Sequence, residues 1–249
     1  MASLSLRHQM VGWRGRIGII YPEDGLLDSD FLRCAPSGVS VHVTRSFRDP
    51  ASDQLDVKLA AAMAERDDIE ASARTFLQID PDCVAYACTA ASFSRGVGFD
   101  QELIRRLEKA SGTRATATAP ASVAALKALG AVRLSVVAPY GQEICDQLRQ
   151  YLGDSGFTVL NLVSLGLADL DIPKTDPGHI FRIARDSCRD DADAIFLSCT
   201  NFRGFEIVVP LERDLGKPVV TANQATMWHA LQLIGIREKR EDLGTLFAP

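Results

Sequence analysis

Two cysteines, each followed by a threonine, stand at the ends of two apolar segments in this chain of 249 residues. The first segment ends in Tyr86-Ala87-Cys88-Thr89-Ala90 and the second in Leu197-Ser198-Cys199-Thr200-Asn201. A thiol can act as a nucleophile or move a proton, and two thiols facing one substrate can do both. The side chains of Thr89, Thr200 and Asn201 suit a carboxylate, because a carboxylate accepts several hydrogen bonds. The pattern therefore indicates acid–base or nucleophilic chemistry on a small anion.

Short apolar segments alternate along the chain with segments of helical periodicity. Strands are predicted at 16–21, 39–43, 83–87, 134–138, 158–163, 194–197 and 218–221. Helices are predicted at about 53–79, 99–109, 121–129, 142–152, 180–189, 206–215 and 224–234. Strands that alternate with helices indicate βαβ units and a parallel sheet, so the predicted fold class is α/β.

The second half of the chain repeats the plan of the first. The interval from the strand at Ile17 to the strand at Val84 is similar to the interval from Leu134 to Ile195. This internal duplication, with a period of about 110 residues, predicts two related α/β lobes that share a broad interface.

Both cysteines follow predicted strands, where parallel sheets bind their ligands. Backbone N–H groups and helix N-termini at such positions favour anions, so we expect the thiolates of Cys88 and Cys199 to be stabilised and their pKa values to be lowered. If the halves are related by a pseudo-two-fold axis, the two thiols face each other across one cleft. Pro22 and Asp24, after the first strand, and Tyr140, after the strand at 134–138, would reach the same cleft if the lobes close there.

Composition and missing motifs exclude several classes of protein. Hydrophobic residues make up 47% of the chain and the net charge is -5, which indicates a globular core and argues against nucleic-acid binding. The six cysteines and four histidines form no metal-binding pattern, and neither nucleotide-binding glycine motif occurs, so no metal or nucleotide cofactor is predicted. Arg95 and Arg203 are candidates for anion binding, although surface arginines are common. No apolar run is long enough to span a membrane and no signal-peptide core precedes the first strand, so we expect a cytoplasmic protein.

Several short segments together resemble the aspartate/glutamate racemase superfamily, in the branch that holds maleate cis-trans isomerases and arylmalonate decarboxylases. The resemblance extends over nearly the whole chain and lies in the order and spacing of seven segments. They are 17–22, 88–96, 128–133, 138–140, 197–199, 215–220 and 228–233.

The resemblance implies a cofactor-independent enzyme with two pseudo-symmetric parallel-sheet lobes and an active site in the cleft between them. It assigns the catalytic cysteines to Cys88 and Cys199, and substrate-carboxylate binding to Thr89, the backbone at Ala90, and Tyr140. The last helix of such enzymes packs onto the first lobe, which places residues 1–117 and 225–249 in one lobe and 118–224 in the other. It also implies a homo-oligomer, a dimer.

Departures from the family pattern bear on the reaction. Arylmalonate decarboxylases have glycine at the positions of Cys88 and Thr200, so the paired cysteines favour isomerases and racemases. Maleate isomerases usually have an asparagine in the loop after the first strand, whereas residues 22–26 here contain none and include Glu23 and Asp24. This loop is reminiscent of the ectoine-utilisation branch of the family.

Isomerisation of a small carboxylate, most concretely maleate to fumarate, is the leading functional prediction. A racemase or epimerase of an amino or hydroxy diacid could use the same two thiols as opposed bases. A malonate-type decarboxylase would need Cys199 alone as a proton donor. A carboxylate-binding protein without catalysis is the alternative from another class, and its thiols need not be reactive.

Overall fold

The computed structural model describes residues 10–47 and 55–248, and their strands form two sheets of four parallel strands each. The first sheet contains β1 (Gly15–Pro22), β2 (Val39–Ser46), β3 (Cys83–Tyr86) and β4 (Arg114–Ala117). The second contains β5 (Arg133–Ala138), β6 (Thr158–Ser164), β7 (Ala194–Leu197) and β8 (Val219–Thr221). The strand orders, β2-β1-β3-β4 and β6-β5-β7-β8, are equivalent, so the second half repeats the first. The predicted α/β fold with two parallel-sheet lobes is confirmed.

The inner strands β3 and β7 are buried at every position, whereas the edge strands β2 and β6 are mostly half-buried. Inner strands of parallel sheets are covered on both faces and therefore consist of nearly continuous apolar residues. This explains why β3 and β7, which precede the two cysteines, could be predicted from composition alone.

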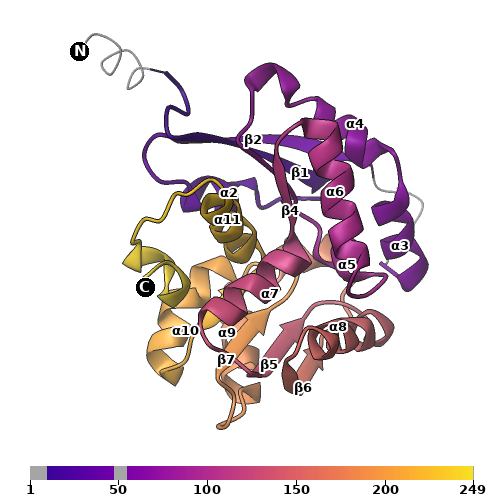
Figure 1. Ribbon diagram of the computed structural model, residues 1–249. Helices are drawn as coiled ribbons and strands as arrows, with labels where there is room; N and C mark the ends of the chain where they lie inside the picture. The colour runs from indigo at the N-terminus through magenta and orange to yellow at the C-terminus, as the bar shows by residue number, and fades with distance from the viewer. Residues whose placement is uncertain (1–9, 48–54, 249) are drawn as a thin grey trace.

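Helices connect the strands and cover the sheets (Figure 1). None of them, within the described ranges, is long and apolar enough to cross a membrane. The α-helices are α2 (Asp28–Cys34), α3 (Val57–Glu65), α4 (Asp68–Arg74), α5 (Thr89–Phe93), α6 (Phe99–Ser111), α7 (Thr118–Ala128), α8 (Gln142–Asp154), α9 (Pro177–Ser187), α10 (Val208–Leu215) and α11 (Ala222–Leu233). Short 3-10 helices lie at η1 (Leu77–Ile79), η2 (Asp169–Lys174), η3 (Phe205–Ile207), η4 (Glu241–Leu243) and η5 (Thr245–Phe247).

The helices α7 and α11 pack against each other between the two sheets (Figure 1). Each directly follows the last strand of one sheet. Helix α11 leaves β8 and contacts β3 and β4 of the first sheet, while α7 leaves β4 and contacts β8 of the second. The hydroxyls of Thr118 and Thr226 form a buried hydrogen bond of 2.9 Å between the two helices. The division of the chain into lobes 1–117 plus 225–249 and 118–224 stays a prediction.

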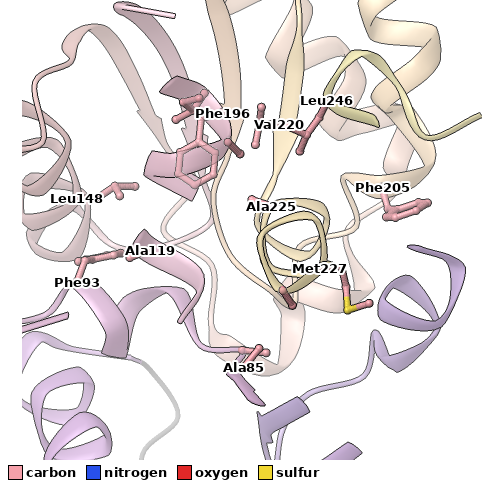
Figure 2. Close-up of a cluster of buried hydrophobic side chains, with 14 of the residues drawn as sticks. Ala85, Phe93, Ala119, Leu148, Phe196, Phe205, Val220, Ala225, Met227 and Leu246 are labelled. Carbon is pink, nitrogen blue, oxygen red and sulfur yellow. The ribbon is translucent and has the colours of Figure 1, made fainter. Parts of the chain in front are cut away.

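One buried apolar cluster spans both sheets, as Figure 2 shows in part. Ala85 comes from the first sheet, Phe196 and Val220 from the second, and Ala225 and Met227 from α11. Because apolar burial is the main stabilising contribution to folding, a cluster shared in this way resists separation of the lobes. The expected broad interface is therefore present.

The helix predicted over about 53–79 is wrong as a single element. Its expected beginning, Asp53, lies outside the described residues, and the remainder is divided into α3, α4 and η1 because Arg66 has an extended backbone, with ψ of 145°. The Arg106 guanidinium donates to the carbonyls of Ala64 at 2.8 Å and Arg66 at 3.1 Å, which satisfies acceptors at the end of α3. Sequence periodicity also missed α5 and the strand β4, both of which are short.

Candidate active site

Cys88 and Cys199 occupy equivalent positions in the two sheets. Each lies two residues beyond the last residue of an inner strand, Tyr86 in β3 and Leu197 in β7. Cys88 is also the N-cap of α5, and its backbone is extended, with φ of -139°. The sheets thus present both thiols at carboxyl strand ends, where loops are available to contact a ligand.

The two cysteines line one small cavity of about 50 Å³. All eight residues predicted for the site border it: Pro22, Cys88, Thr89, Ala90, Tyr140, Cys199, Thr200 and Asn201. The other lining residues among those described are Tyr21, Asp24, Leu55, Met63, Asp169 and Ile172. Asp24 was a candidate from its position after the first strand. Asp169 and Ile172 lie in η2, the element after β6, so their position after a strand could have indicated them. Leu55 lies before α3 and Met63 lies within it, and no strand end indicates either residue.

A larger cavity of about 470 Å³ lies elsewhere, between α11 and the C-terminal segment. Its lining is mostly apolar, with Trp228, Leu231 and Phe247 among the residues, and it contains none of the predicted site residues. We place the candidate active site in the smaller cavity because the two thiols and several hydroxyls converge there.

The expectation of lowered thiol pKa values is wrong for this structure. Burial raises the pKa of Cys88 to about 12 and that of Cys199 to about 12. Backbone N–H groups of Ala91 and Asn201 act in the opposite direction, and the Asn201 N–H lies 3.4 Å from the Cys199 sulfur. The loss of hydration at the buried sulfur outweighs these donors, so both residues are neutral thiols at neutral pH.

Cys199 has a backbone conformation that L-residues rarely adopt. Its φ is 103°, and within the described ranges Asp80 is the other non-glycine residue with positive φ. Such conformations cost about 1–3 kcal/mol and occur preferentially at functional sites. The strained turn presents the thiol in the cavity at the end of β7.

Tyr140 and Thr89 are two hydroxyl-bearing residues of the cavity lining. The Tyr140 hydroxyl interacts with Cys199 and lowers the pKa of that thiol, and the Tyr140 ring packs edge-on against Phe93 at 6.5 Å. The Thr89 hydroxyl is buried, and it has no hydrogen-bond partner among the described residues. A buried donor without a partner is rare, and its place in the cavity lining makes it available to a ligand.

Asn201 contacts the loop after β1 through its amide. Its Nδ2 donates to the carbonyl of Asp24 at 2.9 Å, and its Oδ1 accepts from the backbone N–H of Leu26 at 3.0 Å. The Tyr21 hydroxyl donates to Asn201 Oδ1 at 3.2 Å and to the Thr200 carbonyl at 2.8 Å. These bonds connect the Cys199 loop of the second sheet to the end of β1 in the first.

The arginines considered for anion binding lie outside this cavity lining. Arg95 forms an exposed ion pair with Glu65 at 2.7 Å, and Arg203 pairs with Glu206 at 3.1 Å. The structure therefore does not support either arginine as an anion ligand, and both form ion pairs at the surface.

Comparisons with known proteins place these features in a family. A protein-family model described as arylmalonate decarboxylase matches residues 57–247. The chain is similar to the maleate isomerase of Pseudomonas putida, with 28% identity over 174 residues, which is 67% of this chain and 70% of that protein. It is also similar to the arylmalonate decarboxylase of Bordetella bronchiseptica, with 28% identity over 163 residues, which is 64% of this chain and 68% of that protein.

A solved structure has a similar fold over most of the chain. It is a mutant of the Nocardia farcinica maleate cis-trans isomerase with a covalently bound succinylcysteine intermediate. The TM-score is 0.81 at 23% sequence identity, and the match covers 90% of this chain and 94% of that chain. The predicted resemblance to maleate isomerases and arylmalonate decarboxylases is confirmed, and the chain belongs to the arylmalonate decarboxylase family.

Proposed function

We propose that this protein is a cofactor-independent, two-cysteine isomerase of a small carboxylate, most concretely of maleate to fumarate. The observation that supports this most strongly is the convergence of Cys88 and Cys199 from equivalent strand ends on one cavity. Two thiols allow one to bond to the substrate carbon while the other supplies and removes a proton.

In the reactive form of the enzyme Cys88 is a thiolate, its proton having passed to solvent water, and its sulfur adds to one vinylic carbon of maleate. The C–S bond forms as the π pair moves to the neighbouring carbon, where the attached carboxylate delocalises it. The Cys199 thiol protonates this carbon, which gives a succinyl thioether on Cys88. After rotation about the new single bond, the Cys199 thiolate removes a proton from the same carbon, the double bond re-forms as the trans isomer, and Cys88 leaves as a thiolate.

The remaining groups of the cavity suit a carboxylate of few atoms. The unpartnered Thr89 hydroxyl can donate to one carboxylate, assisted by the backbone at Ala90. Tyr140 and Thr200 border the Cys199 side, and Pro22 and Asn201 complete the lining. A volume of about 50 Å³ is far below the roughly 300–1,000 Å³ of drug-sized ligand pockets, which favours maleate over an acid with an aryl group.

The relatives support the same assignment. Maleate isomerases are among the similar curated proteins, and the Nocardia farcinica structure contains a succinylcysteine, the adduct expected from thiol addition to maleate. Arylmalonate decarboxylation is the second candidate, because the matching family model and the Bordetella bronchiseptica relative have that description.

Proton NMR of the purified protein in D2O tests the proposal. Separate samples contain maleate, phenylmalonate, and D- and L-aspartate. We expect fumarate to appear from maleate, and to be lost in Cys88→Ala and Cys199→Ala but retained in Cys188→Ala, whose thiol does not line the cavity. Release of carbon dioxide from phenylmalonate alone would favour the decarboxylase, and deuterium at an α-carbon of aspartate would favour a racemase. Fumarate formation that survives Cys199→Ala would contradict the two-thiol mechanism.

We also propose that the protein forms a homodimer, as the family resemblance implies. Sedimentation velocity at several protein concentrations tests this, since a monomer of 27.0 kDa and a dimer sediment at clearly different rates. A single monomeric species throughout would contradict it.

A further inference from the structure

Tyr86 has a buried hydroxyl that the fold itself does not explain. It is the last residue of β3, and its side chain is fully buried. Among the described residues, no group meets the geometry of a hydrogen bond to its hydroxyl. A buried polar group without a partner costs free energy, and phenylalanine at this position would avoid that cost. The hydroxyl therefore points to a role outside the resting fold.

The Tyr86 side chain lies on the same side of its strand as the Cys88 side chain. Val84, Tyr86 and Cys88 pack in one apolar cluster of the first lobe, whereas Ala85 and Ala87 pack in the central cluster between the sheets. This alternation is that of an extended chain, in which residues two apart share a face. Tyr86 and Cys88 thus lie on the same face, away from the central cluster.

Three polar groups meet at this place. The Tyr86 hydroxyl lowers the pKa of Cys88, and Cys88 raises the pKa of Tyr86 in return. Ser46, the last residue of β2, has a buried hydroxyl that also lacks a partner among the described residues, and it lowers the pKa of Tyr86. The thiol, the phenol and the serine hydroxyl are therefore neighbours, although neither hydroxyl has a partner in good hydrogen-bond geometry among the described residues.

We propose that Tyr86 is a positioning residue, whose hydroxyl donates a hydrogen bond to the Cys88 sulfur once that sulfur is a thiolate. A neutral thiol is a weak acceptor, while a thiolate is a strong one, so the hydroxyl is unpaired in the resting enzyme and paired in the reactive state. Ser46 can then donate to the phenolic oxygen. Each thiol of the cavity accordingly has its own tyrosine, Tyr140 for Cys199 and Tyr86 for Cys88.

This inference rests on the proposed nucleophilic role of Cys88, but its test does not need turnover. The rate of Cys88 alkylation by iodoacetamide is measured by peptide mass spectrometry as a function of pH, in the wild type and in Tyr86→Phe. Because loss of a hydrogen bond to a charged group disfavours the thiolate, we expect Cys88 in Tyr86→Phe to react about tenfold more slowly at a given pH. Labelling of Cys199 should be unchanged, and the melting temperature should be unchanged or higher.

Tyr151→Phe provides a matched control, because it should lower stability without changing the labelling of Cys88. The Tyr151 hydroxyl is buried and donates a hydrogen bond to Asp100 at 2.8 Å, so its removal should cost stability, while Cys88 should be labelled at the wild-type rate. Equal labelling of Cys88 in Tyr86→Phe and the wild type at every pH would overturn the proposal, as would a Tyr86→Phe protein that only loses stability. Slower labelling of Cys88 together with no turnover of maleate by the wild type would keep this inference and reject the proposed substrate.

Discussion

The Tyr21 hydroxyl donates a 2.8 Å hydrogen bond to the carbonyl oxygen of Thr200, and both partners are buried. Tyr21 lies near the end of β1 in the first sheet, and Thr200 follows Cys199 at the end of β7 in the second. Asn223 of α11 donates to the same carbonyl at 2.9 Å. The position of the second thiol therefore depends on donors outside its own sheet.

Replacing Tyr21 by phenylalanine should affect both stability and turnover. The variant leaves one donor fewer for two buried acceptors, Thr200 O and Asn201 Oδ1, which should lower the free energy of unfolding by about 1–2 kcal/mol. Because the Cys199 loop loses a support, kcat should also fall. Urea unfolding and steady-state kinetics measure the two effects. Lower stability with unchanged kcat would mean that the bond only holds the lobes together.

The order of strands and helices and most residues of the candidate site could be predicted from the sequence. The inner strands are continuous apolar runs, so their ends at Cys88 and Cys199 could be located, and parallel sheets bring such ends to the ligand side. Pro22 is the last residue of β1 and Tyr140 follows β5, and both were found by the same rule. Short elements such as α5 and β4 contain too few residues to show a period.

Properties that depend on the three-dimensional surroundings could not be obtained in this way. The ionisation of the thiols depends on how completely the cavity excludes water, and local donors alone suggested the wrong direction. The break between α3 and α4 is satisfied by Arg106, which is 40 residues away from Arg66 in the chain. The neighbourhood of Tyr86, Ser46 and Cys88 requires the lateral order of three strands, which sequence periodicity does not contain.

Replacing Thr89 by valine should weaken substrate binding without weakening the fold. The Thr89 hydroxyl has no partner among the described residues, so its removal leaves no acceptor unsatisfied, and valine fills the same space. If this hydroxyl binds a carboxylate, KM should rise about tenfold, with an unchanged melting temperature. Thr113→Val is a suitable control, because its hydroxyl bonds to the Asp82 carbonyl and does not line the cavity. Equal KM values for Thr89→Val and the wild type would remove Thr89 from the binding site.

Asp30 should make the protein less stable at neutral pH than at mildly acidic pH. Its side chain is buried, and burial raises its pKa from 3.8 to about 6, although Asn223 donates to it at 2.9 Å. Since the folded pKa is above the unfolded one, the stabilising contribution is complete below about pH 4 and is lost as the pH rises through 6.

Asparagine is close in shape to the protonated acid, so Asp30→Asn should be more stable than the wild type above pH 6. A shift of about two units corresponds to an upper bound of about 3 kcal/mol. Urea unfolding at several pH values measures the difference, which should vanish near pH 4. A constant difference across this range would show that Asp30 does not titrate as the structure indicates.

The raised thiol pKa values predict the pH dependence of catalysis. With the pKa of Cys88 at about 12, the thiolate fraction of the free enzyme is small and rises tenfold with each pH unit below that value. Because kcat/KM reports ionisations of the free enzyme, log kcat/KM should increase with a slope near one from about pH 6 to about pH 9, without a plateau. A plateau near pH 7 would mean that Cys88 is a thiolate in the free enzyme and that its surroundings are more polar than described.

Cys199→Gly and Cys199→Ala should both be inactive but should differ in stability. Both remove the thiol, whereas only glycine adopts a φ of 103° without steric cost. Relief of about 1–3 kcal/mol of strain is partly offset by the greater chain entropy of unfolded glycine, about 0.5–1 kcal/mol, so the glycine variant should be more stable by about 1 kcal/mol. Chemical denaturation of the two variants under the same conditions measures this difference. Since both lack the sulfur, the comparison isolates the backbone, and a glycine variant less stable than the alanine variant would show that the turn at Cys199 stores no strain.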